Sequence, residues 1–305
     1  MIEPLVPLLA SPPEFSDRFV HDEAEHVLVS TSPEPVVVPI ENGVPNFLAL
    51  TDTNSNQRNE GGSGPSFDYL DHYAKDAEFF DYFAAPEDPA TRHENRRLHE
   101  AIRRNLPGEP STILDVGCGG AWFAKAATPL GHTVVSFDAA NLNTIRALRE
   151  VPHRNHFAVT GDANALPFRP ESFDVVVSAE VIEHVAELEP YLDNILRVLK
   201  PGGRAIISTP YNEKIQYSLC IHCNRSTPLH AHLRSFKENT LDKYVAGKAG
   251  VSIRPIVFSS KILLFLRTHA ALKFLPHRPW RFIDSVTNAI IRKPSRLIYI
   301  LHKEE

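Results

Sequence analysis

Two short stretches of the sequence contain side chains that could do chemistry. Residues 179–185 read AEVIEHV, so Glu180, Glu183 and His184 would share one face if this segment begins a helical turn. Two carboxylates and an imidazole suit a hard divalent cation, and an imidazole beside an acceptor can serve as a general base. Residues 113–124 read ILDVGCGGAWFA, a glycine-rich turn that can offer backbone N–H groups to an anion. These stretches predict a reactive centre and a ligand-binding loop.

A third stretch combines cysteines and histidines. Residues 220–236 read CIHCNRSTPLHAHLRSF, which places Cys220 and Cys223 in a C-x2-C pair ahead of His230 and His232. Such a pair with a histidine could hold zinc in a tetrahedral site. The other interpretation is that both thiols pack in a loop. Only three cysteines occur in the chain, too few for a disulfide framework and consistent with a reducing compartment.

Regular alternation of strands and helices surrounds these stretches. Apolar runs rich in Val and Ile alternate with amphipathic segments, which predicts a parallel, doubly wound α/β sheet whose strands end at the ligand-binding edge. The predicted strands are 112–117, 133–139, 156–163, 173–181 and 204–211, and the helices between them are 121–131, 141–151 and 189–200. An amphipathic helix is also predicted over 67–83.

Two further carboxylates lie at predicted strand ends. Asp138 follows Gly119 by 19 residues, where a carboxylate can accept both hydroxyls of a ribose. Asp162 ends the next strand in GDANALPF, where it could read the edge of an adenine. A dinucleotide fingerprint would need glycine at the position of Trp122, so the loop is not of that type.

With LKPGGRAIIS at 199–208, these motifs resemble those of the class I S-adenosylmethionine-dependent methyltransferases over about residues 110–260. The resemblance implies a Rossmann-like, seven-stranded sheet and S-adenosyl-L-methionine as cofactor. It also implies which residues bind the parts of that cofactor. These are Asp115, Gly117, Cys118 and Gly119 for the methionine part, Asp138 for the ribose, Asp162 and Ala163 for the adenine, and Glu180 at the cofactor edge.

The E-x-x-E-H pattern is similar to that of ubiquinone-pathway O-methyltransferases and small-RNA 2′-O-methyltransferases. In those families a later histidine completes a divalent metal site, and His232 occupies that place here. The resemblance thus implies a Mg or Zn ion on Glu180, Glu183, His184 and His232, with Glu183 and His184 catalytic. The alternative without a metal has His184 act alone as a base or as a scaffold.

The chain ahead of this domain has its own pattern. Residues 1–50 resemble a small zinc-ribbon module, but the four ligand places hold Ser11, Glu14, Thr31 and Glu34, so we expect no zinc there. Residues 51–66 are polar and predict a flexible linker. The remainder, 67–305, would form the methyltransferase domain. We leave open whether the β-rich module is a lid, a substrate gate or a dimer contact.

Charge and hydropathy limit the partners. Residues 1–260 carry 23 Lys and Arg against 34 Asp and Glu, which disfavours broad nucleic-acid binding. A secretory signal and an 18-residue apolar run are both missing, so we expect a cytoplasmic protein. A basic, apolar insertion at about 261–293 separates predicted strands 251–260 and 295–303. It could be two helices over a substrate pocket, or 261–305 could contact anionic lipid as a peripheral membrane surface.

These observations predict a methyltransferase that acts on a small or lipophilic molecule, at oxygen. Two alternatives stay open, an RNA 2′-O-methyltransferase and a non-catalytic cofactor-binding regulator. A regulator would not need carboxylates and an imidazole at 180–184, so the side chains present there favour an enzyme. The sequence does not indicate the acceptor or the oligomeric state.

Overall fold

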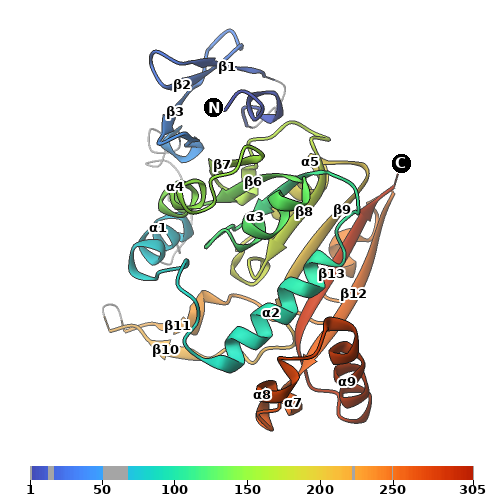
Figure 1. Ribbon diagram of the computed structural model, residues 1–305. Coiled ribbons are helices and arrows are strands. Elements are labelled where there is room, and N and C mark those ends of the chain that lie inside the picture. Colours follow the sequence, from blue (N-terminus) through green and yellow to red (C-terminus); the bar gives the residue numbers. More distant parts are fainter. Residues whose placement is uncertain (1, 13–16, 51–67, 222–223, 249, 305) are drawn as a thin grey trace. The chain divides into compact units, whose positions relative to one another are not determined.

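The computed structural model describes residues 2–12, 17–50, 68–221, 224–248 and 250–304 (Figure 1). The predicted linker 51–66, Cys223 of the predicted zinc site and Glu14, at one of the ribbon-like positions where no zinc is expected, lie outside the described residues. The chain divides into two compact units. The first contains Met1–Ala84, Gly108–Val177 and Pro190–Gly203, and the second contains Ala85–Pro107, Ser178–Glu189 and Arg204–Glu305.

The main sheet has seven strands in the order β12-β13-β9-β8-β5-β6-β7. In chain order these are β5 (Thr112–Val116), β6 (Thr133–Asp138), β7 (His156–Thr160), β8 (Phe173–Ala179), β9 (Leu199–Pro210), β12 (Val251–Ser260) and β13 (Pro294–Lys303). Strands β5, β6 and β7 pair in parallel, while β13 runs antiparallel to β9 and to β12. The predicted seven-stranded α/β fold is therefore confirmed.

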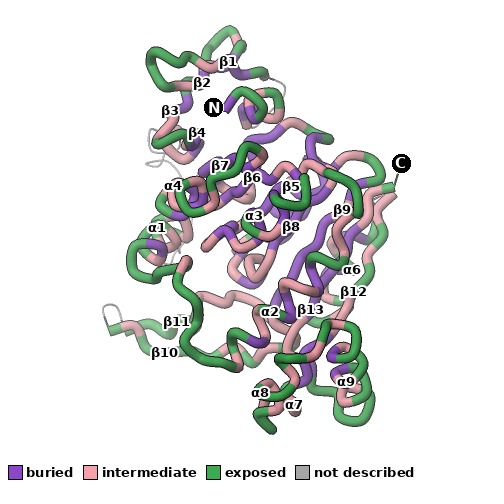
Figure 2. The backbone as a smooth tube through the Cα atoms, in the orientation of Figure 1, coloured by how far each residue is buried: buried purple, intermediate pink, exposed green. Residues whose placement is uncertain are grey.

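The helices that the sequence predicts over 67–83, 121–131, 141–151 and 189–200 are present with shorter bounds. They are α1 (Tyr69–Phe79), α3 (Trp122–Ala127), α4 (Asn141–Glu150) and α5 (Leu188–Val198), whose first two residues belong to the second unit. Strands β5 and β6 are almost wholly buried, as the purple segments in Figure 2 show. The parallel register pairs Asp115 with Ser136 and Asp138 with Thr160, so successive strands end at one edge.

The N-terminal residues form a small antiparallel sheet of β1 (Phe19–Asp22), β2 (Val27–Ser30), β3 (Val37–Glu41) and β4 (Val44–Pro45). The strand-like runs of this segment are EHVLVS (25–30) and PVVVPIENGVPNFL (35–48), so β1 lies outside the runs that predict strands. This module is joined to the rest of the first unit by backbone contacts. The Ala10 N–H donates to the Pro167 carbonyl oxygen at 3.1 Å, and Asn46 forms an isolated parallel β-bridge with Thr160.

The second unit contains several elements that the sequence analysis did not predict. Helix α2 (Pro89–Arg103) begins at Asp88, whose side chain accepts the Thr91 N–H, and proline occupies the first turn, so the helix-start signal was present. Strands β10 (Tyr217–Leu219) and β11 (Ser226–Pro228) form a hairpin. Over residues 237–250, where the sequence KENTLDKYVAGKAG does predict a helix, the structure has the shorter α6 (Asp242–Val245).

The insertion between β12 and β13 differs from the two helices that were expected. It contains three, α7 (Lys261–Phe265), α8 (His269–Leu272) and α9 (His277–Ile290). Arg267, between α7 and α8, has a positive φ of 55°. A non-glycine residue in that conformation interrupts a right-handed helix, so the segment is split into shorter pieces. No helix in the described parts of the chain is long and apolar enough to span a membrane.

Candidate active site

The glycine-rich loop joins β5 to α3 in the first unit. Gly117 and Gly119 adopt positive φ values of 74° and 45°, which glycine tolerates without strain. A side chain at Gly120 would place its Cβ 2.1 Å from the Tyr82 carbonyl oxygen, so this position accepts only glycine while Tyr82 lies there. The segment after α1 therefore lies directly against the loop.

Asp138, at the end of β6, fixes the loop through its carboxylate. Oδ2 accepts the Gly119 N–H at 3.0 Å, and Oδ1 accepts the Ala140 N–H at 2.9 Å. The Cys118 sulfur lies 3.9 Å from Oδ2, and burial raises the pKa of this thiol well above its usual value. Burial also raises the pKa of Asp138, against the effect of the two backbone donors. Three of the predicted cofactor residues are thus brought together.

Asp115 is the most unusual carboxyl group of this loop. Its side chain is 2% exposed, and Oδ2 has no hydrogen-bond partner among the described residues. Burial, with a smaller contribution from the negative charge of Asp138, raises the pKa of Asp115 to about 8. A buried carboxyl group that lacks a cation gains its charge only at a cost, so this position favours a positively charged neighbour.

Asp162 caps the short 3₁₀ turn Ala163–Ala165 after β7. Its Oδ1 accepts the Asn164 N–H at 2.8 Å, and its Oδ2 accepts a hydrogen bond from the Tyr69 hydroxyl of α1. Asn164 also donates to that hydroxyl, at 3.3 Å. Sequence reasoning missed Tyr69, because nothing in its helix links it to a residue 93 positions away.

Glu180 belongs to the second unit and does not lie in the predicted helical turn. It has a positive φ of 59°, and the 3₁₀ turn that follows spans Ile182–His184. Its carboxylate accepts the Ser208 hydroxyl at 3.0 Å and pairs with the Arg296 guanidinium. Arg296 therefore compensates the negative charge of Glu180, the carboxylate that the sequence predicted to bind a metal ion.

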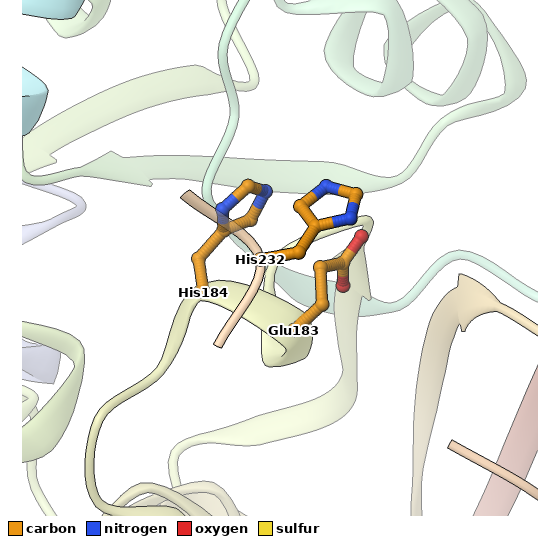
Figure 3. Close-up of side chains that lie close together, drawn as sticks. All are labelled: Glu183, His184 and His232. Atoms are coloured by element: carbon orange, nitrogen blue, oxygen red, sulfur yellow. The ribbon is translucent and has the colours of Figure 1, made fainter. Parts of the chain in front are cut away.

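The structure groups Glu183, His184 and His232 in the same unit, as Figure 3 shows. One ligand atom from each residue lies within 4.8 Å of the other two. The two imidazole rings pack edge to face with their centroids 4.8 Å apart. The Leu233 N–H donates to the Glu183 carbonyl at 2.8 Å, which joins the two segments that carry the cluster. We name these three residues the Glu–His cluster.

Burial dominates the electrostatics of the Glu–His cluster. Glu183 is 1% exposed, and its Oε2 has no hydrogen-bond partner among the described residues. Burial and then the negative charge of Glu180 raise the pKa of Glu183 well above its usual value. A carboxyl group in such surroundings either holds a proton or needs a cation.

Glu213 is a second residue that sequence reasoning missed. Its carboxylate lies 2.5 Å from Nδ1 of His232, whose side chain is 14% exposed. A carboxylate at one ring nitrogen fixes the tautomer that leaves the other nitrogen as an acceptor. A cavity of about 140 Å³ borders the pair and is also lined by Lys214, Ile215, Gln216, Leu229 and His230.

The cysteine and histidine stretch is described only in part. Cys220 follows β10, and its N–H donates to the Arg225 carbonyl across the hairpin at 2.8 Å. Its predicted zinc partner Cys223 lies outside the described residues, so the zinc prediction stays a prediction. His232 lies in the Glu–His cluster, and the His230 ring is 5.9 Å from it.

Comparisons with known proteins agree with this fold. Residues 114–207 match the family described as "Methyltransferase domain". The human ubiquinone biosynthesis O-methyltransferase, a mitochondrial protein by its name, is 34% identical over 133 residues, 41% of this chain and 36% of that protein. The ubiquinone biosynthesis O-methyltransferase of Chelativorans sp. (strain BNC1) is 36% identical over 111 residues, 35% of this chain and 43% of that protein. This chain therefore matches less than half the length of either relative.

Solved structures show the same architecture. The crystal structure of an S-adenosylmethionine-dependent methyltransferase from Mesorhizobium loti aligns with a TM-score of 0.50 at 18% identity. The alignment covers 69% of this chain and 99% of that one. At 18% identity this likeness shows the fold alone. The assignment as a methyltransferase rests on the family match and on the sequence relatives. This chain contains a class I S-adenosylmethionine-dependent methyltransferase domain.

Proposed function

We propose that the protein transfers the methyl group of S-adenosylmethionine to an oxygen atom of a small or lipophilic acceptor. The Glu–His cluster is the observation that carries the proposal, because it adds acid–base or metal-binding side chains that a cofactor-binding regulator would not need. The oxygen assignment is supported by two relatives that are named O-methyltransferases. A small acceptor also agrees with the excess of acidic residues over 1–260, which disfavours RNA.

The residues of the first unit fit the cofactor. S-adenosylmethionine supplies a methyl group that its sulfonium charge already activates. The buried Asp115 carboxyl, which lacks a hydrogen-bond partner on Oδ2 among the described residues, would face the positively charged methionine part. Asp138 would accept the ribose hydroxyls, and Asp162, together with the Ala163 N–H, would contact the adenine. Tyr69 would orient Asp162 through its hydroxyl.

The Glu–His cluster fits a divalent metal ion with three of the four ligands predicted from the sequence. A buried carboxylate oxygen without a partner among the described residues and two imidazoles offer a mixed oxygen and nitrogen set. Two imidazoles suit zinc better than magnesium. When bound, such an ion would lower the pKa of an acceptor hydroxyl. Glu213 would hold the His232 ring in the ligating orientation.

The alternative without a metal uses the same residues. His184 would take the proton from the acceptor hydroxyl, and Glu183 would stabilise the imidazolium that forms. A general base contributes about 10²- to 10⁴-fold to a rate, so either mechanism makes the cluster essential. Chelation distinguishes them, because it removes only the metal.

The test is methyl transfer from radiolabelled S-adenosylmethionine by the full chain, with an alkyl-substituted catechol, an alkylamine and a short RNA as acceptors. We expect transfer to the catechol, loss of transfer after chelation and recovery with Zn²⁺. His302→Ala, a histidine of the same unit outside the cluster, should behave as the wild type. Transfer that survives chelation supports the alternative without a metal, in which His184 is the base. Transfer only to the amine or to RNA contradicts the proposed acceptor.

A further inference from the structure

The insertion between β12 and β13 concentrates positive charge. Residues 261–293 hold seven basic side chains, Lys261, Arg267, Lys273, Arg278, Arg281, Arg292 and Lys293. The single acidic residue within 261–293 is Asp284, which is fully buried. Arg281 pairs with Asp284 and Arg292 pairs with Glu238, and the other basic side chains give the insertion a basic surface on a chain whose first 260 residues carry an excess of acid.

Helix α9 exposes large apolar side chains instead of hiding them. Phe282, Val286 and Ile290 are 70%, 43% and 77% exposed. They follow one another at intervals of four, so they form one stripe along the helix. Arg278 precedes the stripe by four residues, and Lys293 follows it closely in the chain, so positive charge flanks both ends.

The opposite face of α9 is fixed to the second unit. Trp280 is 2% exposed, and the buried Asp284 accepts the N–H groups of Ser259 and Ser260 at 3.1 and 2.6 Å. Arg281 donates to the Val257 carbonyl at 2.9 Å. These contacts to β12 hold the helix with its apolar stripe toward solvent, so the exposure is a property of the fold.

The neighbouring short helices add to the same surface. Phe265 and Leu266, at the end of α7, are 84% and 61% exposed, and Phe274, after α8, is 78% exposed. Helices α7, α8 and α9 lie together at one end of the second unit (Figures 1 and 2). We call the exposed residues of 261–293 the insertion surface.

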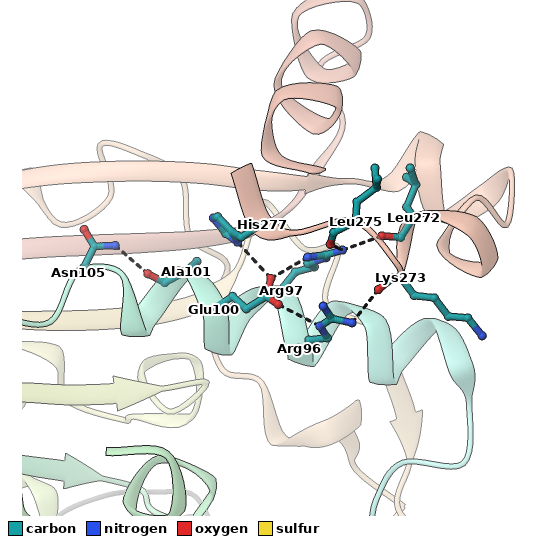
Figure 4. A network of polar contacts seen from close by, with 9 residues as sticks. All are labelled: Arg96, Arg97, Glu100, Ala101, Asn105, Leu272, Lys273, Leu275 and His277. Atoms are coloured by element: carbon teal, nitrogen blue, oxygen red, sulfur yellow. Dashed lines mark hydrogen bonds and ion pairs between the residues drawn. The ribbon is translucent and has the colours of Figure 1, made fainter. Parts of the chain in front are cut away.

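A network around α2 holds this segment in place (Figure 4). Arg97 is fully buried, and its guanidinium donates to the carbonyls of Leu272 and Leu275 at 2.7 and 2.9 Å. Arg96 donates to the Lys273 carbonyl at 2.7 Å, while the Lys273 side chain points away from the network. The backbone of the segment is thus tethered, and its cationic and aromatic side chains stay outside.

We propose that the insertion surface docks the protein on an anionic lipid bilayer. Exposed phenylalanines and isoleucines can enter the interface, and lysines and arginines beside them can contact lipid phosphates. The negative surface potential of such a bilayer attracts each basic residue that lies near it. A second copy of this chain is a poorer occupant, because it would bring the same positive charges face to face. The proposal does not depend on which acceptor is methylated.

The test is co-sedimentation of the full chain with vesicles of phosphatidylcholine alone or with about 30% phosphatidylserine. We expect the anionic vesicles to bind at least about tenfold more protein, and 0.5 M NaCl to reduce that binding. The double variant Phe282→Ser/Ile290→Ser should lower binding about tenfold or more, since two apolar side chains leave the interface. Arg278→Glu/Lys293→Glu should abolish the preference for anionic lipid.

Controls separate docking from misfolding and from self-association. Leu130→Ser removes a leucine of the first unit that is 56% exposed, and it should bind vesicles as the wild type does. Circular dichroism should show that all variants melt near the wild-type temperature. Absence of vesicle binding, or equal binding by the Phe282→Ser/Ile290→Ser variant, would overturn the proposal. So would a dimer in light scattering that this variant dissolves.

Discussion

The cofactor loop and the Glu–His cluster are built in different ways. In the loop, the groups proposed to bind S-adenosylmethionine belong to the ends of consecutive strands, and Asp138 contacts Gly119 through the backbone N–H. In the cluster, His232 comes from a segment 48 positions after His184 in the sequence, and Glu213 fixes it from a third segment. The loop depends on backbone geometry, whereas the cluster depends on side chains from separate segments.

The difference shows which parts of a site tolerate change. A backbone turn with a carboxylate at each strand end survives as long as the sheet survives, because parallel strands end at one edge. A cluster of side chains needs every partner to be present. We therefore expect substitutions in the cluster to affect turnover and those in the loop to affect cofactor affinity.

The largest effect is expected for Glu183→Gln. Loss of the buried carboxylate should reduce kcat by about 10³-fold, in the range of an acid–base or metal-ligand group. The dissociation constant for S-adenosylmethionine should change by less than about threefold, measured by calorimetry. A large rise of that constant would show that cluster and loop are not separate in function.

Asp138→Ala should have the opposite profile. Loss of the two proposed ribose contacts, each a hydrogen bond to a charged group, should weaken S-adenosylmethionine binding by about 100-fold. With saturating cofactor, kcat should stay within about tenfold of the wild type. Asp174→Asn serves as the control. It also removes a carboxylate of the first unit, but one that accepts the Thr112 N–H. Equal binding by Asp138→Ala would remove this residue from the cofactor site.

Glu213→Gln tests the orienting carboxylate. Outer partners of ligating histidines change metal affinity by about 10- to 100-fold, and we expect a loss near the lower value. Titration of Zn²⁺ into the chelated full chain measures it. If Zn²⁺ binds the variant and the wild type equally, Glu213 does not orient a ligand.

Asp115→Asn should change the stability of the folded chain with a defined pH dependence. The pKa of Asp115 is raised to about 8 in the folded chain, so the folded state holds this proton more tightly than the unfolded one. Its contribution to stability is present at low pH and is lost as the pH rises toward 8. Without cofactor, the asparagine variant should therefore gain stability over the wild type by about 1.4 kcal/mol per pH unit between pH 5 and pH 8, so that its advantage is larger at pH 8.5 than at pH 5.

The measurement is urea denaturation at both pH values, with S-adenosylmethionine titrations alongside. The same variant should bind the cofactor more weakly, because it cannot provide the charge that faces the methionine part. If the variant gains no stability at pH 8.5, the ionised Asp115 carboxylate does not destabilise the folded chain. His153→Ala, on the surface of the first unit, is the control for general effects of substitution.

The fold was predictable because its signals are local. Strands β5, β6, β7 and β8 are short apolar runs that end at glycine or acidic residues, and each occurs within a few residues of its expected bounds. Helix α2 also carried local signals, at Asp88 and Pro89, which the sequence analysis did not use. The three helices of the insertion were harder, since the break at Arg267 has no glycine or proline to announce it.

The candidate site was predictable only where spacing reports geometry. Asp115, Asp138 and Asp162 stand at strand ends, so their common edge follows from the sheet. Tyr69 and Glu213 act through contacts with distant residues, and a single sequence contains no record of such pairs. Glu180 was assigned to a metal for its spacing, whereas Arg296, from the last strand, engages its carboxylate.

Calorimetric titration of S-adenosylmethionine into the chelated full chain, for the wild type and for Glu183→Gln, tests most directly whether the cofactor loop binds without the Glu–His cluster. We expect binding at one site with dissociation constants that agree within about threefold, since the cofactor loop does not need the cluster. If the chelated wild type does not bind S-adenosylmethionine, or if Glu183→Gln abolishes the binding, the cofactor loop is not independent of the Glu–His cluster.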